Sequence, residues 1–135
     1  MATRSTISIL NADGSVQTVY CHWDGYLEGV GKTLLENYNT REAVEKLISG
    51  GAISSLGSYI SENKESFDRP EDEDYTVYYS FRGEDQPAET YSSLEDYEAN
   101  HQFEEFDYIF NDDMWSVFIS SKQDWYDVEY ELENR

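Results

Sequence analysis

The sequence predicts an α+β fold: a mainly antiparallel sheet of about six strands with two or three helices, in a single acidic domain that spans residues 1–135. Three observations support this prediction. β-Rich segments occur near both ends of the chain, two segments between them have apolar residues at helical spacing, and turn residues separate them. A hairpin, then helices, then further strands is an order typical of this fold class.

The first half is predicted to contain a hairpin followed by two helices. Residues 6–10 and 16–20 are rich in β-branched residues and flank an Asp-Gly turn, which is a strong hairpin signal. Residues 27–38 carry apolar side chains at helical spacing. Residues 41–49 repeat this pattern after Thr40, which can cap a helix.

The second half is predicted to be rich in strands. These strands cover residues 75–81, 106–110, 115–119 and 125–133. Between the first two, Ser93 can cap a short helix over residues 94–100. Residues 61–74 are polar and are expected to form an exposed loop, whereas residues 52–60 fit either a buried loop or a short helix.

Composition indicates a folded protein with a large excess of negative charge. Apolar residues form 39% of the chain and aromatic residues 16%, whereas disordered acidic chains contain few aromatic residues. The 29 acidic and 9 basic residues give a net charge of −20. Residues 67–135 hold 21 acidic and 4 basic residues, a net charge of −17, and residues 1–66 hold the other −3. Because solubility requires far less charge, this excess predicts a cationic partner.

The same charge argues against two classes of partner. Direct nucleic-acid recognition needs Lys and Arg beside the phosphates, and attraction to an anionic membrane has the same requirement. The N-terminal segment lacks the apolar run of a signal peptide, and no stretch approaches the roughly 20 apolar residues of a membrane span. Cys21 is the one cysteine, which excludes an internal disulfide and favours a reducing compartment. We therefore expect a cytoplasmic protein that binds neither nucleic acid nor membrane.

Residues 125–133 carry the most regular acidic pattern, because charged and apolar residues alternate as they do along a strand with two different faces. The acidic face of this predicted strand holds Asp127, Glu129, Glu131 and Glu133, about 6.6 Å apart. Such a row can present to a cationic groove a pattern similar to the phosphates of nucleic acid. The row also fits a solvated face, or an edge strand that charge protects against aggregation.

Two other acidic patches are predicted to contribute to the same partner-binding surface. One lies in the polar loop and consists of Glu71, Asp72, Glu73 and Asp74. The other lies in the predicted turn between the strands at 106–110 and 115–119 and consists of Asp112 and Asp113.

The sequence contains no convincing pattern for catalysis, a metal or a cofactor. The segment around Gly31 resembles a phosphate-binding loop, but Tyr26 stands where that motif requires its first glycine. Cys21 and His22 are adjacent, so they point apart and cannot form a nucleophile–base pair, and they are too few for zinc. The acidic runs lack the glycine and final glutamate of a calcium-binding EF-hand loop. Nothing indicates a buried carboxylate pair for hydrolysis. We predict no catalytic residue, no metal site and no cofactor.

A resemblance adds an expectation about origin. The run Val-Tyr-Cys-His-Trp-Asp-Gly-Tyr at residues 19–26, with Gly29, Gly31 and the following helix to Tyr38, resembles a family of small, mostly uncharacterised phage and prophage proteins. The match covers roughly residues 5–60 and brings no catalytic residues with it. Small, very acidic phage proteins often look like DNA mimics, which occupy the DNA-binding channels of restriction enzymes, CRISPR effectors, repressors or nucleoid proteins.

Two hypotheses from different classes follow. The first is a non-enzymatic, phage-type anti-defence inhibitor, a DNA mimic that blocks the groove of a basic nucleic-acid-binding host protein in the host cytoplasm. The second is a self-associating structural or assembly phage protein with an acidic, solubilising surface. An exposed final strand can pair with a second copy, so a homodimer is compatible with both. An enzyme ranks third, because it would need a buried carboxylate pair in a cleft.

Overall fold

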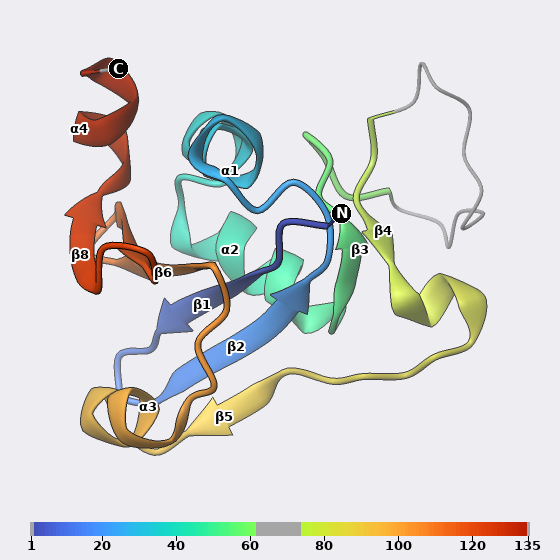
Figure 1. Ribbon diagram of the computed structural model, residues 1–135. Coiled ribbons are helices and arrows are strands. Elements are labelled where there is room, and N and C mark those ends of the chain that lie inside the picture. The colour runs from blue at the N-terminus through green and yellow to red at the C-terminus, as the bar shows by residue number, and fades with distance from the viewer. Residues whose placement is uncertain (1, 62–73, 135) are drawn as a thin grey trace.

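Residues 2–61 and 74–134 are described by a computed structural model, which shows an α+β fold built on one mixed sheet (Figure 1). Within these ranges the sheet has eight strands in the order β4-β3-β2-β1-β6-β7-β8, and β5 pairs with β2 outside this path. The strands are β1 (Ser5–Leu10), β2 (Val16–Cys21), β3 (Ile53–Ser55), β4 (Val77–Tyr78), β5 (Glu89–Tyr91), β6 (Phe106–Asn111), β7 (Met114–Ile119) and β8 (Asp124–Asp127). The helices are η1 (a π-helical turn, Leu27–Gly31), α1 (Lys32–Asn37), α2 (Arg41–Ser49), η2 (a 3-10 turn, Tyr79–Arg82), α3 (Leu94–Asn100) and α4 (Val128–Glu133).

The α+β class is confirmed, but the pairing differs from the prediction in detail. β1 pairs in parallel with β6, with Thr6 opposite Asp107, and β2 pairs in parallel with β3 at Cys21 and Ile53. The other pairings are antiparallel. Parallel pairing needs a long connection, and the helices between the first hairpin and the later strands provide one. The strands β3 and β5 are three residues long, too short for a β-pattern to be recognised in the sequence.

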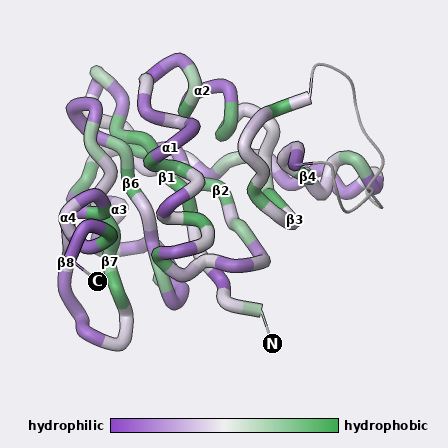
Figure 2. The backbone as a smooth tube through the Cα atoms, turned by 90° about the horizontal axis from the view of Figure 1, so that it is seen from above, coloured by the Kyte–Doolittle hydropathy of each residue, from purple (hydrophilic) through white to green (hydrophobic). Residues whose placement is uncertain are grey.

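The main core lies between the sheet and the helices on one of its faces. In Figure 1, α1 and α2 cover this face of β1 and β2, whereas α3 lies on the opposite side. Ile7 and Ile9 of β1 are fully buried against Leu34 of α1 and Leu47 of α2, and Val128 of α4 joins the same cluster. Hydrophobic stretches, drawn in green, occur along the central strands of the sheet in Figure 2.

The opposite face of the sheet is more polar. Its small apolar cluster consists of Val16, Tyr97 and Ile109, with α3 providing the tyrosine. Around this cluster the strands bury a group of polar side chains: Thr6, Ser8, Thr18 and Asp107. Such groups require hydrogen-bond partners inside the protein, because water does not reach them.

Local sequence signals predicted several element boundaries correctly. α2 and α3 have the bounds expected from periodicity, and each begins with the expected cap. The Thr40 side chain accepts a hydrogen bond from the backbone N–H of Ala43 at 3.2 Å, and the Ser93 side chain accepts one from Asp96 at 3.0 Å. Gly14 has a φ of +90° in the first hairpin turn, a conformation that favours glycine.

Two predicted segments in the middle of the chain differ in the structure. The strand expected over residues 75–81 is limited to β4, because the chain turns into the 3-10 helix η2 directly after Tyr78. The Tyr78 hydroxyl donates to the backbone carbonyl of Leu47 at 2.7 Å, which fixes this strand against the end of α2. Residues 52–60 were expected to form a buried loop or a short helix. They contain a strand instead, because Ile53–Ser55 form β3.

The prediction of one amphipathic strand over residues 125–133 is wrong. Strand β8 ends at Asp127, and α4 follows from Val128 to Glu133. The Asp127 side chain accepts a hydrogen bond from the backbone N–H of Tyr130 at 2.9 Å and thereby caps the helix. Glutamate favours helix over strand, and Val128 and Leu132 are four residues apart, so one face of a helix can bury both. Tyr130, which the strand would have placed on the apolar face, is 61% exposed.

Candidate functional site

Helix α4 changes the geometry of the predicted carboxylate row. Successive residues of an α-helix are rotated by about 100°, so Glu129 and Glu133 share one side of α4 and Glu131 lies roughly opposite. Asp127 lies at the helix N-cap and Glu131 is half-buried, whereas Glu129 and Glu133 are exposed. The four carboxylates therefore do not form a straight row on one face, and the predicted regular spacing is incorrect.

The structure instead brings three predicted partner-binding residues together around one hollow of about 260 Å³. Asp113 comes from the β6–β7 turn, Asp127 from the end of β8 and Glu129 from the first turn of α4. The remaining lining residues are Leu35, Asn39, Met114 and Trp115. We call these seven residues the acidic hollow. It combines carboxylates with an apolar lining, which is the composition expected of a protein-binding surface for cationic side chains.

A tight turn holds Asp113 in the lining of the acidic hollow, with Asp112 next to it in the chain. Asp112 and Asp113 have φ values of 52° and 61° and connect β6 to β7 as a two-residue hairpin loop. Positive φ at both central residues is typical of a type I′ turn, in which Asp and Asn are well tolerated. Both side chains are exposed, and the neighbouring Met114 is 56% exposed. The predicted hairpin here is confirmed.

Of the third predicted acidic patch, the structure describes Asp74 alone. Glu71, Asp72 and Glu73 lie outside the described residues. Asp74 is exposed, and its backbone carbonyl accepts a hydrogen bond from the N–H of Ser58 at 2.8 Å. It precedes β4, at the opposite end of the strand order from β8, so the structure does not bring it to the acidic hollow (Figure 1).

Most carboxylates in the described ranges face solvent without a nearby cation. Asp107 is the one buried acidic residue there, and the others are exposed or half-exposed. Within these ranges arginine pairs with carboxylates twice, as Arg41 with Glu45 at 3.8 Å and Arg82 with Glu84. No such pair is recorded there for Asp113, Asp127 or Glu129. In the described ranges, most carboxylates are therefore exposed to solvent.

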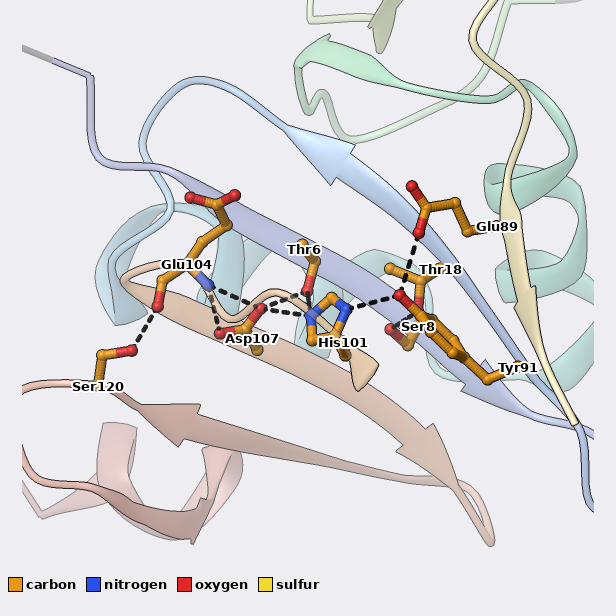
Figure 3. Close-up of polar contacts among 9 residues, drawn as sticks. All are labelled: Thr6, Ser8, Thr18, Glu89, Tyr91, His101, Glu104, Asp107 and Ser120. Carbon is orange, nitrogen blue, oxygen red and sulfur yellow. Dashed lines mark hydrogen bonds and ion pairs between the residues drawn. The ribbon is translucent and has the colours of Figure 1, made fainter. Parts of the chain in front are cut away.

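A second site, which the sequence did not indicate, surrounds the buried carboxylate of Asp107 (Figure 3). Thr6 donates a hydrogen bond to Asp107 Oδ1 at 2.6 Å, and His101 Nε2 lies 3.0 Å from the same oxygen. The backbone N–H of Glu104 donates to Oδ2 at 3.0 Å. On the other side of the imidazole, the Tyr91 hydroxyl lies 3.3 Å from His101 Nδ1 and donates to Glu89 at 3.0 Å. We call Thr6, Glu89, Tyr91, His101 and Asp107 the His101 network.

Hydrogen-bond counting identifies the role of each group in the His101 network. The Asp107 carboxylate only accepts, so His101 Nε2 carries the proton in their contact. The Tyr91 hydroxyl has a single proton, which it donates to Glu89. The network thus connects a fully buried carboxylate to an exposed one through two rings.

The His101 network fixes the segment that follows α3 to the polar face of the sheet. The His101 ring stacks on Tyr97 with their centroids 4.4 Å apart, and the His101 side chain is only 4% exposed. The alternation of the segment Phe106–Asn111 indicates that Asp107 points away from the main core. Its partner Thr6 could not be identified from the sequence, because the parallel pairing of β1 with β6 joins residues far apart in the chain.

Cys21 and His22, the adjacent candidates for a nucleophile–base pair, lie in different environments. Cys21 is fully buried in the main core, and this burial raises the pKa of its thiol to about 12. The His22 side chain instead contacts the Tyr20 hydroxyl at 2.7 Å. The glycines around Gly31 belong to the helical segment η1, so their amides do not form a phosphate-binding loop.

Two further observations concern metals and membranes. In the described ranges, no three His, Cys, Asp or Glu side chains gather closely enough to hold a metal ion. Among the described helices, none combines the length and the apolar character needed to cross a bilayer.

Comparison with known proteins gives no relative for this chain: no family model, no curated protein and no solved structure matches it. The candidate sites are therefore argued from the geometry and charge of this chain alone.

Proposed function

We propose that this protein is a non-enzymatic inhibitor of the phage type, which blocks the nucleic-acid-binding groove of a basic host protein such as a CRISPR effector or a restriction enzyme. The observation that carries the proposal is a net charge of −20 on a folded scaffold whose carboxylates are mostly exposed. The grooves of nucleic-acid-binding proteins are lined by Lys and Arg, which bind carboxylates through charge-assisted hydrogen bonds as they bind phosphates. In this respect the protein acts as a DNA mimic.

The mimicry rests on charge density and not on a phosphate-like repeat. The turn of the chain into α4 removes the even spacing of the predicted row, but it leaves Asp113, Asp127 and Glu129 around one hollow. The exposed side chain of Met114 lies among these charges and offers apolar contact area. An interface of this kind has an apolar centre with charged groups around it.

The test begins with capture of basic proteins from host lysate on the immobilised protein at low salt, followed by identification of the captured proteins. Each candidate is then assayed for displacement of its labelled DNA or RNA by the inhibitor. We expect displacement whose affinity falls steeply as salt rises, because salt screens exposed charge pairs. The proposal fails if captured proteins keep their nucleic acid, or if no basic protein is retained.

A matched pair of variants tests the acidic hollow. The first variant combines Asp112→Asn, Asp113→Asn and Glu129→Gln, and it leaves the helix cap Asp127 intact. The second combines Glu42→Gln, Glu95→Gln and Glu98→Gln, which removes the same charge from exposed positions on α2 and α3. The first should weaken displacement at least about tenfold, since three exposed charge pairs are worth roughly 1–3 kcal/mol. The second should change it far less, and equal effects would exclude the acidic hollow as the contact surface.

A self-associating assembly protein is the second candidate, and one observation favours it. β8 pairs with β7 on one side and ends the described strand order, and Tyr130 of the adjoining α4 is 61% exposed. An edge strand of this kind can pair with a second copy. Sedimentation velocity at several salt concentrations separates the two candidates: association that strengthens with salt supports assembly, whereas a monomer at all salt concentrations excludes it.

A further inference from the structure

A polar cleft of about 370 Å³ lies where strand β2 changes its neighbours. β5 pairs with the start of β2, from Val16 to Thr18, whereas β3 joins β2 only at Cys21. Between these two pairings, Val19 and Tyr20 line the cleft. The lining also includes Glu89, Tyr91, His101 and Glu104.

The chemistry of this lining favours a positively charged ligand. It contains two carboxylates, Glu89 and Glu104, and it contains neither lysine nor arginine. Tyr20 and Tyr91 also line the cleft, and aromatic rings attract cations. An anion would be repelled by this wall, and a neutral ligand would leave the carboxylates without a charged partner.

One wall of the cleft is held rigidly by the His101 network. The Glu89 carboxylate accepts a hydrogen bond from Tyr91 at 3.0 Å, and Tyr91 contacts the buried His101 at 3.3 Å. His101 is in turn fixed by Asp107 at 3.0 Å. Of the two Glu89 carboxylate oxygens, Oε2 accepts the hydrogen bond from Tyr91, and Oε1 has no hydrogen-bond partner within the described ranges. Oε1 is therefore available to a ligand at the exposed end of the His101 network. A preorganised carboxylate binds a cation more tightly than a mobile one.

The volume of the cleft limits the size of the ligand. Sites for drug-sized ligands occupy about 300–1,000 Å³, and this cleft lies at the lower end of that range. It has room for a small organic cation or for one side chain of a protein.

We propose that this cleft binds a guanidinium or ammonium group on a short alkyl chain, with Glu89 as its main charge partner. Two sources share this chemistry, a free small cation and an arginine or lysine side chain of a protein. The inference does not depend on the proposed inhibition, because the cleft shares no residue with the acidic hollow.

The test is a titration of the full-length, isotope-labelled protein with butylguanidinium, followed by NMR of the Tyr, His and amide signals. Butylurea is the control ligand, since it has nearly the same shape and no charge. We expect saturable shifts that are centred on Tyr20, Tyr91 and His101 with butylguanidinium and absent with butylurea. Shifts spread over the acidic surface without saturation would reject the site, because they would show general counterion attraction.

Two variants assign the binding to the cleft. Glu89→Gln removes the proposed charge partner from an exposed position, and we expect about tenfold weaker binding. Glu95→Gln removes the same charge from an exposed position on α3 outside the cleft and should leave the affinity within about twofold. Equal weakening by both variants would overturn the proposal. If Glu89→Gln disturbs the fold, Glu104→Gln provides a second test with the same expected direction.

A further titration distinguishes the two sources. The capped tripeptide acetyl-Gly-Arg-Gly-amide presents the same guanidinium on a peptide backbone. Binding that is tighter than that of butylguanidinium and equally sensitive to Glu89→Gln indicates a protein side chain, whereas exclusion of the peptide with retained butylguanidinium binding indicates a free small cation. Failure of both ligands to bind would reject the cleft as a cation site without affecting the test of nucleic-acid displacement.

Discussion

Asp107 shows at the scale of one residue what a buried charge requires in this fold. It is fully buried, and it accepts hydrogen bonds from Thr6, His101 and the backbone of Glu104. A buried carboxylate without such partners would be strongly destabilising. The three donors come from β1, from the residue after α3 and from the loop before β6, so one side chain joins three parts of the chain.

Asp107→Asn should lower the free energy of unfolding by about 2–3 kcal/mol. The amide keeps one accepting oxygen and replaces the other with a donor, so either the Glu104 N–H or the pair Thr6 and His101 loses its acceptor. Urea unfolding followed by circular dichroism measures the change. Asp112→Asn is the matched control at an exposed turn position and should stay within about 0.5 kcal/mol of the natural protein. Equal stability of both variants would show that the His101 network contributes nothing to folding.

Tyrosine ionisation gives a prediction at alkaline pH. Burial, together with the hydrogen bond to Glu89 and its charge, raises the pKa of Tyr91 to about 12, and burial also raises the pKa of Tyr97. The unfolded chain loses these protons near pH 10, whereas the folded protein still retains them. The unfolded state therefore binds fewer protons in this window, and stability falls as the pH rises from about 10 to about 12.

The measurement is urea unfolding at several pH values between about 8 and 12, with phenolate absorbance recorded in parallel. Tyr91→Phe should reduce the slope of stability against pH, because it removes one of the protons involved. A stability that is constant across this range would contradict the raised pKa values.

At the scale of the element, residues 124–133 show how one pattern is compatible with two structures. Alternation of acidic and apolar residues predicts a strand, but the same residues place Val128 and Leu132 four apart, as on one side of a helix. Whether a strand or a helix forms depends on which apolar side chains can be buried in the core in each case. Val128 is fully buried in the main core, and Tyr130 is left largely exposed, so burial of one stripe together with capping by Asp127 outweighs the alternation.

Asp127→Ala should destabilise the protein by about 1 kcal/mol, because the Tyr130 N–H loses the side chain that caps α4. Loss of helical signal in circular dichroism and a lower urea midpoint are the expected observations. Glu133→Gln, at the last residue of α4, removes a charge from the same helix without removing a cap and should be neutral or slightly stabilising. A neutral Asp127→Ala would mean that packing alone determines where β8 ends.

At the scale of the whole molecule, the charge opposes the fold that carries it. Mutual repulsion within a net charge of −20 destabilises the compact state, and dissolved salt screens that repulsion. Selection for stability alone would have removed part of this charge. The surplus therefore supports a function in which the charge itself is used, as the proposed inhibition requires.

The melting temperature should rise by several degrees between about 20 mM and 300 mM sodium chloride. Differential scanning calorimetry provides the measurement. The melting temperature of the variant that neutralises Glu42, Glu95 and Glu98 should respond less to added salt, because this variant starts with less repulsion. A melting temperature independent of salt in the natural protein would show that the repulsion is negligible.

The elements differ in how far they could be predicted from the sequence. α2 and α3 have the expected bounds because periodicity and caps are local properties, and so are the turns at Gly14 and at Asp112. β3 and β5 were missed because each is held by its neighbour in the sheet and not by its own composition. Charge in the sequence predicts the acidic residues of the candidate surface, and their role in binding stays a prediction, whereas the turn into α4 that arranges them could not be predicted from charge.

The sequence alone determined the fold class, the first hairpin, two capped helices and the large negative charge, because each depends on composition or on residues close together in the chain. Only the tertiary structure decided that β1 lies beside β6, that Asp107 is buried next to His101 and that the last acidic residues follow a helix. These outcomes depend on contacts between segments as far apart as Thr6 and Asp107, and on competition for places in one core. The alternation of residues within a short segment contains no information about distant contacts or about competition for the core.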